Sequence, residues 1–138
     1  MEVMKILKEM TPEVEKLFKD KNFASIATMM RDCSPQVTPV WVDYDQGNIL
    51  INTAEGRTKV RNVRNNPMVA VSVIDSGNPY TMVAVRGRVV EQTSQGADEH
   101  IDKLAKKYLG VDKYPFRAPD EKRVLLKIKP ESVIFMSP

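Results

Sequence analysis

The stretch from residue 52 to residue 64, NTAEGRTKVRNVR, holds the side chains best suited to chemistry in this sequence. Its pattern predicts a strand that ends at Asn52 and Thr53 and, after a glycine-containing loop, a short helix that begins with Arg57 and Lys59. The first turn of a helix exposes unpaired N–H groups and partial positive charge, which favour an anion. An arginine fork and a lysine point charge there suit a terminal phosphate. The same charges are compatible with a solvated basic helix face, and charge alone does not separate the two interpretations.

The single cysteine and the single histidine indicate no further reactive site. Cys33 lies in a polar stretch, and one cysteine forms neither an internal disulfide nor a metal cluster, so no metal site is predicted. Its isolation is typical of a reducing cytoplasm. His100 is distant in sequence and lies in a helical pattern, so a Cys–His nucleophile is not favoured. The role of Cys33 and the identity of any catalytic acid or base stay open.

Size, charge and hydropathy narrow the class of protein. The chain has 138 residues and 42% hydrophobic content, which fit one domain, residues 1–138, with one core. No apolar run approaches the ~20 residues that span a bilayer, and Glu2, Lys5 and Lys8 argue against a secretory signal or an anchor. We therefore expect a cytoplasmic protein without a membrane partner. Nucleic acid is not an expected partner, since the basic stretch 57–64 lacks aromatic residues that stack on bases.

Two kinds of hydrophobic periodicity alternate along the chain. Apolar residues fall at helical spacing from Val3 to Phe18, with a break at Pro12, a typical first-turn proline after an N-cap threonine. Pro39 cannot donate to a ladder, so its strand is expected at an edge or a bulge, and Gly87 marks a further bulge. The expected helices are 12–20, a short one from residue 57 that Asn65-Asn66-Pro67 end, and 94–109; the expected strands are 22–30, 36–44, 49–53, 68–74, 80–91 and a last pair or one kinked strand over 123–129 and 132–136.

The order of these elements predicts the fold class. Roughly five or six mostly antiparallel strands, with helices at the ends and between hairpins, favour a closed barrel over a sandwich. The hairpins argue against a parallel sheet of strand–helix–strand units. No GxGxxG motif follows a strand, so a Rossmann dinucleotide site has no support. We therefore predict a mainly β domain with flanking helices.

Five segments of the sequence match the pattern of a known family. They are FASIATM, PQVTPVWVDYD, ILINTAEGRTKVRNVRNNPMVAVSV, VRGRV and RVLLKIKPESV, which together cover nearly the whole chain. In these segments the sequence resembles the pyridoxamine 5′-phosphate oxidase-like family of FMN-binding split barrels. The long central segment resembles the branch that includes deazaflavin (coenzyme F420)-dependent reductases. The resemblance implies a six-stranded antiparallel split β-barrel and a homodimer with two cofactors at its interface.

The resemblance also assigns a cofactor site to particular residues. It implies that Arg57 and Lys59 hold the cofactor phosphate, and that the tricyclic ring lies along the strand 37–42 and contacts its backbone. It further implies that Asn52 and Thr53, at the end of the next strand, contact the ring, and that Met82 lies against the cofactor of the partner subunit. The expected cofactor-binding residues are Val37, Thr38, Pro39, Val40, Trp41, Asn52, Thr53, Arg57, Thr58, Lys59, Arg61 and Met82.

Two features depart from the family's pyridoxamine phosphate oxidases. Val37 stands where those enzymes have a phosphate-binding arginine, and the chain ends in ESVIFMSP instead of a basic, histidine-containing motif. Oxidation of pyridoxamine phosphate is therefore not predicted. The expected function is an oxidoreductase that transfers a hydride between the cofactor and a small organic substrate. The alternative is a carrier that binds FMN or the deazaflavin with little catalysis.

Coenzyme F420 is the preferred cofactor, and FMN is the second candidate. Both carry the ring, the ribityl chain and the phosphate, but the deazaflavin continues into a tail with carboxylates. Such a tail needs a cationic exit beside the phosphate. Arg61 follows Lys59 on the same helix, and Lys5 or Lys8 is expected nearby. The substrate, and whether oxygen accepts electrons, stay open.

Several other side chains have plain structural explanations. Trp41 alternates with valines and is expected in the core or in a dimer interface. Tyr114 and Phe116 are expected to form a satellite hydrophobic cluster rather than a lid. A solvated helix face is expected for Lys103, Lys106, Lys107 and Lys113.

Overall fold

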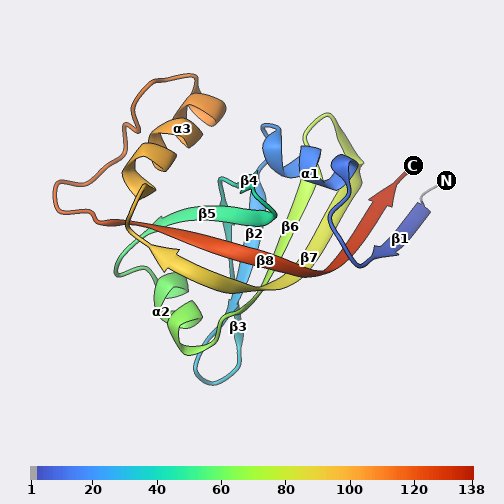
Figure 1. The fold of residues 1–138 in the computed structure, drawn as a ribbon, viewed down its shortest axis with the longest axis horizontal. Helices are drawn as coiled ribbons and strands as arrows, with labels where there is room; N and C mark the ends of the chain where they lie inside the picture. The colour runs from blue at the N-terminus through green and yellow to red at the C-terminus, as the bar shows by residue number, and fades with distance from the viewer. Residues whose placement is uncertain (1–2) are drawn as a thin grey trace.

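The fold is described for residues 3–138 in a computed structural model, drawn in Figure 1. In chain order the elements are β1 (Val3–Leu7), α1 (Pro12–Lys19), β2 (Ala24–Met29), β3 (Pro35–Val40), β4 (Asp43–Asp45), β5 (Asn48–Ala54), α2 (Thr58–Asn65), β6 (Met68–Asp75), β7 (Asn78–Thr93), α3 (Ala97–Leu109) and β8 (Arg123–Ser137). Among the described residues, no helix combines the length and the apolar character needed to cross a membrane.

The strands form one antiparallel sheet whose two ends meet. The strand order is β3-β2-β6-β7-β8-β5-β4, and β1 pairs with β8 off this path. β3 and β4 lie at opposite ends of the order, yet only Trp41 and Val42 separate them in the chain. Because consecutive Cα atoms are about 3.8 Å apart, the sheet must curl until its end strands lie together. The predicted mainly β barrel with flanking helices is confirmed.

The sheet has eight strands where six were expected, and the predicted strand 36–44 accounts for one of the two additions. This segment is two strands, β3 and β4, because the chain turns at Trp41 and Val42 to cross between the two ends of the sheet. Pro39 lies on β3 opposite Ser25 of β2, and β3 stands at the end of the strand order. The edge position predicted from the proline is therefore confirmed.

The other additional strand is β1, where helical spacing was the wrong guide. β1 pairs antiparallel with the end of β8, with Leu7 opposite Val133. A single turn of helix is costly to form alone, whereas pairing with β8 satisfies the backbone groups of a short segment. The helix after the break is confirmed: Thr11 is the N-cap of α1, and its hydroxyl accepts from the Val14 N–H at 3.4 Å.

The long strands and α3 follow the prediction with small shifts. A register irregularity lies between Arg86 and Gly87 of β7, so the predicted bulge is confirmed. The last segment is the single long strand β8. α3 begins later than the predicted residue 94, after Gly96 with a φ of +76°, and ends before Gly110 with a φ of +74°. Both glycines adopt a left-handed conformation that other residues rarely take.

Two hydrophobic clusters hold the elements that shape the site. The main core fills the barrel and includes Phe18 of α1, Ile26 of β2 and Leu126 of β8, all fully buried. A separate cluster joins α3 to the β3–β4 connection; it consists of Ile101, Leu104 and Tyr108, with Trp41 and Tyr114 packed against it. α3 therefore fixes the two-residue connection that closes the barrel.

Candidate functional site

A pocket of about 400 Å³, here called the main pocket, lies beside the connection that closes the barrel. It collects residues from the end of β3, the end of β5, the start of α2, the start of β8 and the loop after α3. Its lining residues are Phe23, Pro39, Val40, Trp41, Asn52, Thr53, Ala54, Arg57, Lys59, Ile101, Tyr114, Phe116 and Arg123. The predicted pair Arg57 and Lys59 thus shares a cavity with Pro39, Val40, Trp41, Asn52 and Thr53.

One end of the main pocket is strongly cationic. Arg57 is the N-cap of α2, and the first turn of that helix holds Lys59 and no acidic residue. Burial lowers the pKa of Lys59, and the charges of Arg57 and Arg123 lower it further. The positive end of the helix dipole adds to this field. We call Arg57, Lys59 and Arg123 the cationic cluster.

Arg123 is a pocket residue that sequence reasoning missed. Its side chain is only 6% exposed, and its Nε donates to Asn52 Oδ1 at 2.9 Å. Its Nη1 lies 3.1 Å from Glu121 Oε2, and its guanidinium carbon lies 5.1 Å from the centre of the Tyr114 ring. β8 begins at this residue, and the register of β8 against β5 brings it to the pocket. An arginine at the start of an apolar strand is the signal that could have drawn attention to it.

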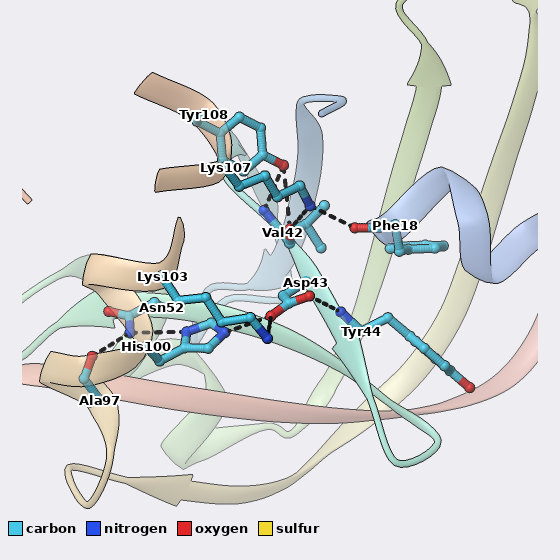
Figure 2. Close-up of polar contacts among 10 residues, drawn as sticks. All are labelled: Phe18, Val42, Asp43, Tyr44, Asn52, Ala97, His100, Lys103, Lys107 and Tyr108. Carbon is cyan, nitrogen blue, oxygen red and sulfur yellow. Dashed lines mark hydrogen bonds and ion pairs between the residues drawn. The ribbon is translucent and has the colours of Figure 1, made fainter. Parts of the chain in front are cut away.

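Asn52 also links the main pocket to a buried histidine and carboxylate, as Figure 2 shows. Its Nδ2 donates to Ala97 O at 2.8 Å and lies 3.3 Å from His100 Nδ1. His100 Nε2 lies 3.1 Å from Asp43 Oδ2, and both side chains are 9% exposed. Burial raises the pKa of Asp43, but hydrogen bonds from His100 and the Tyr44 amide, with the Lys103 charge, outweigh burial and lower the pKa to about 2. The carboxylate is therefore ionised at neutral pH.

Lys107 and Tyr108 fix the wall of the main pocket from behind. Lys107 Nζ donates to Val42 O at 2.7 Å and to Phe18 O at 2.9 Å, and burial lowers the pKa of this lysine to about 8. The solvated face expected of the α3 lysines was therefore wrong for Lys107, which lies against the barrel (Figure 2). Tyr108 stacks on Trp41 with ring centres 5.1 Å apart, and its hydroxyl accepts from the Val42 N–H at 3.1 Å. Burial raises the pKa of Tyr108 to about 12.

The aromatic residues of the loop after α3 line the main pocket. Tyr114 packs edge-on to Trp41 at 5.9 Å between ring centres and belongs to the α3 cluster, as expected for a satellite cluster. Phe116 packs edge-on to Tyr114 at 5.8 Å but stays 67% exposed. Phe23, which sequence reasoning did not single out, adds a further exposed aromatic ring to the pocket.

Several predicted site residues lie outside the main pocket. Thr58 and Arg61 line a second pocket of about 380 Å³, and the Arg61 guanidinium donates to Gly56 O at 2.7 Å. Val37 is exposed on β3, and Met82 lies on β7 away from the main pocket. The residues of this second pocket are Met30, Arg31, Thr58, Arg61, Asn62, Arg64 and Asn65.

Thr38, Lys5 and Lys8 are also absent from the lining of the main pocket. The Thr38 hydroxyl is buried and has no hydrogen-bond partner within residues 3–138. Lys5 lies opposite Phe135, near the end of β8, whereas Arg123 begins that strand. Since each strand residue spans about 3.3 Å, neither Lys5 nor Lys8 lies beside the cationic cluster, and Figure 1 shows β1 at the opposite end of β8. The exit expected from these two lysines was wrong.

Comparison with known proteins identifies the family. Residues 10–137 match the family model described as pyridoxamine 5′-phosphate oxidase. The chain belongs to this family. A solved structure described as an F420 reductase shares 30% identity with a TM-score of 0.76, covering 86% of this chain and 94% of that one. No curated protein matches the chain. The resemblance to the FMN-binding split barrels of the pyridoxamine 5′-phosphate oxidase family is therefore confirmed.

More distant structures of the same fold extend the comparison. A FAD-binding protein from Mesorhizobium loti shares 22% identity with a TM-score of 0.69, covering 97% of each chain. General Stress Protein 26 from Bacillus anthracis shares 18% identity with a TM-score of 0.63, covering 86% of each chain. At these identities the likeness shows the fold alone. The family and the F420 reductase together support a flavin-type oxidoreductase function.

Proposed function

We propose that this chain is an oxidoreductase that binds a phosphate-bearing flavin or deazaflavin in the main pocket and transfers a hydride between it and a small organic substrate. The cationic cluster carries this proposal. Glu121 is ion-paired to Arg123, so three cations against one carboxylate leave roughly two positive charges. The phosphate monoester of FMN carries about −1.5 to −2 charges at pH 7 and neutralises them. The phosphate of F420 is esterified on both sides because the tail continues from it, so it carries a single negative charge and neutralises part of them.

The rest of the main pocket suits a flat ring system. Its volume of about 400 Å³ falls in the usual range for small-molecule sites. Pro39, Val40 and Trp41 supply an apolar wall, and in the part of the chain that the structure describes no acidic side chain lines the cavity. The proline has no N–H to donate, which leaves its strand edge open to a ring.

The chain's own residues have binding and orienting roles in this proposal. The cofactor, when bound, supplies the hydride chemistry. The cationic cluster and the N-terminal N–H groups of α2 hold its phosphate. The apolar wall and the aromatic loop residues Tyr114 and Phe116 exclude water from the ring.

Coenzyme F420 is the cofactor we favour, with FMN as the second candidate. Its support is the 30% identity to the F420 reductase and the position of Arg61, which follows Lys59 on α2 and lines the second pocket. A tail that carries carboxylates would pass this guanidinium. FMN, which lacks the tail, needs no cation beyond the phosphate.

Titration of the purified protein with both cofactors, followed by absorbance, tests the proposal. We expect each to bind, with F420 the tighter, and we expect Arg61→Ala to weaken F420 while leaving FMN unchanged. Arg64→Ala is the matched control, because Arg64 is paired to Glu55 at 2.9 Å one turn further along α2. FMN binding at least tenfold tighter, about 1.4 kcal/mol, overturns the choice of F420. Failure of both cofactors to bind overturns the proposed function.

A carrier with little catalysis is the alternative function at the same pocket. Enzyme and carrier differ in whether the bound, reduced cofactor is consumed. Rapid oxidation of the reduced cofactor by a small organic acceptor, followed by absorbance, supports the enzyme. A reduced cofactor that stays bound and unreactive toward acceptors and oxygen supports the carrier.

A further inference from the structure

His100 is the centre of a hydrogen-bond chain that runs from a buried carboxylate to the main pocket. Asp43 Oδ2 lies 3.1 Å from His100 Nε2, and His100 Nδ1 lies 3.3 Å from Asn52 Nδ2. On the other side of the same amide, Asn52 Oδ1 accepts from Arg123 Nε at 2.9 Å. Figure 2 shows the part of this chain from Asp43 to Asn52. The chain ends at a member of the cationic cluster.

The donors and acceptors in this chain allow one protonation state of the imidazole. Arg123 only donates, so it must face the amide oxygen of Asn52. The carbonyl of Ala97 only accepts, so it must face the amide nitrogen, which also faces His100. His100 Nδ1 therefore accepts and carries no proton, and Nε2 carries the proton that it donates to Asp43.

We propose that His100 is a positioning residue for the phosphate end of the main pocket: as the neutral Nε2–H tautomer it fixes the amide of Asn52, which holds the Arg123 guanidinium in place. The inference rests on the proposed function. With a proton on Nδ1, the N–H of the imidazole and the N–H of Asn52 Nδ2 would face each other, and two donors form no hydrogen bond. Asn52 would then have to turn away, and Arg123 would lose its 2.9 Å acceptor. Phosphate affinity therefore falls when His100 becomes charged.

Charged groups from three elements act on this imidazole, directly or through its hydrogen-bond partners. Asp43 of β4 attracts a proton to it, while Lys103 of α3 lies 3.3 Å from the same carboxylate and offsets part of that attraction. Lys107 of α3 also acts on the Asp43 charge. Arg123 of β8 opposes a second proton through Asn52. The contact of Nδ1 with the Asn52 amide nitrogen is the one that favours the neutral Nε2–H form over the doubly protonated ring.

Nitrogen NMR of the free protein tests the tautomer without any cofactor. His100 is the only histidine of the chain, so protein labelled with ¹⁵N-histidine gives one imidazole signal set. At pH 8 we expect a protonated Nε2 and a bare Nδ1. The opposite tautomer, or a doubly protonated ring at pH 8, overturns the inference. This result stands whether or not the proposed function holds.

Affinity measurements for FMN and coenzyme F420 between pH 5 and 8 test the positioning role. His100→Gln keeps one donor and one acceptor but does not titrate, and the ratio of wild-type to variant affinity cancels the titration of the ligand phosphate. We expect similar affinities at pH values where NMR shows a neutral imidazole, and wild-type binding about fivefold to tenfold weaker than the variant where it shows a charged one. A flat ratio while the imidazole titrates overturns the positioning role. Absence of binding to the wild type overturns the proposed function instead.

A reciprocal measurement covers the case in which the glutamine variant does not fold. If the charged imidazole weakens cofactor binding, bound cofactor must by linkage resist protonation of the imidazole by the same factor. We therefore expect the NMR titration of His100 in the wild type to move to lower pH when FMN or F420 is bound. An unchanged titration overturns the positioning role.

Discussion

Arg57 and Lys59 place two cations where a helix N-terminus already favours an anion, and both line the main pocket. We expect Arg57→Ala or Lys59→Ala to weaken cofactor binding by about 1.5–3 kcal/mol, the range for hydrogen bonds to charged groups. Arg64→Ala is the control, because Arg64 lies on the same helix, does not line the main pocket and is already paired to Glu55. Calorimetric titration of the three variants measures the difference. Equal small losses in all three would return these residues to a solvated basic face.

Asp43 makes the stability of the fold depend on pH at the acid end. Its pKa is lowered from 3.8 to about 2: burial acts against the shift, and the hydrogen bonds from His100 and the Tyr44 amide, with the Lys103 charge, outweigh it. A carboxyl with a lowered folded-state pKa stabilises the fold above its unfolded value, and this stabilisation is lost as pH falls through the folded value. Here the window runs from about pH 4 to pH 2.

Asp43→Asn measures this contribution. We expect the variant to lower the free energy of unfolding by about 1–2 kcal/mol at pH 7, with the difference from wild type shrinking by about half at pH 3. Urea denaturation of both proteins at the two pH values gives the numbers. A difference as large at pH 3 as at pH 7 would mean that another property of the substitution, such as packing, causes the loss.

Single residues were predictable where the signal is local in the chain. Arg57 and Lys59 stand out because the glycine loop and the helix start adjoin them. Arg123 and His100 do not stand out in the sequence, because their partners are remote in the chain. In the sequence 71 positions separate Arg123 from Asn52, and 57 separate His100 from Asp43. Only the register of β5 against β8 and the docking of α3 bring these groups together. Neither the strand register nor the docking of the helix can be predicted from local sequence patterns.

Elements were predictable where local propensity and tertiary context agree. The N-cap before α1, the proline on β3 and the glycine bulge on β7 all followed from the backbone limits of single residues. β1 failed because its apolar spacing fits a helix, while the free edge beside the end of β8 is a property of the whole sheet. The turn at Trp41 and Val42, which divides the expected strand 36–44, was missed for a similar reason. An apolar run in the sequence does not show that the barrel closes there.

The bulge of β7 gives a prediction at the scale of the element. A Cβ atom added to Gly87 would lie 2.2 Å from the backbone oxygen of Lys129, so β7 and β8 would have to separate there. We expect Gly87→Ala to lower the free energy of unfolding by about 1–3 kcal/mol, as overpacking does. Gly77→Ala is the control, since its Cβ would meet only Asp75 Oδ1 at 3.6 Å. Urea denaturation compares them, and equal effects would refute the close approach as the cause.

At the scale of the whole molecule, one face of the sheet carries little charge over five strands and β1. Side chains that alternate with the buried core residues fall into rows across the strands. One row is Val37, Ala27, Ala70, Arg86 and Ser132; the next is Pro39, Ser25, Ser72, Ala84, Ile134 and Ile6; the third is Ile74, Met82, Met136 and Met4. Of these residues only Arg86 is charged, and Ile6 is 74% and Val37 64% exposed. An apolar face of this extent is typical of a protein–protein interface.

We propose that this face is buried in a twofold symmetric homodimer. Pro39 belongs both to the middle row and to the wall of the main pocket, so a partner seated on the face would also reach the pocket. Met82, in the third row, would then lie toward the partner's cofactor, as the family resemblance implies. Small side chains along the middle row allow two sheets to approach closely.

A charge in the middle row tests the dimer. Ala84 is exposed on β7 between Ser72 and Ile134, so Ala84→Arg puts a cation into the centre of the proposed interface, where it would be desolvated without a partner. We expect wild type to sediment as a dimer at low micromolar concentration, and Ala84→Arg to sediment mainly as a monomer with weakened cofactor binding. Ala118→Arg, in the exposed loop after α3, should leave both properties unchanged. A wild-type monomer that binds cofactor stoichiometrically would show that one subunit completes the site by itself.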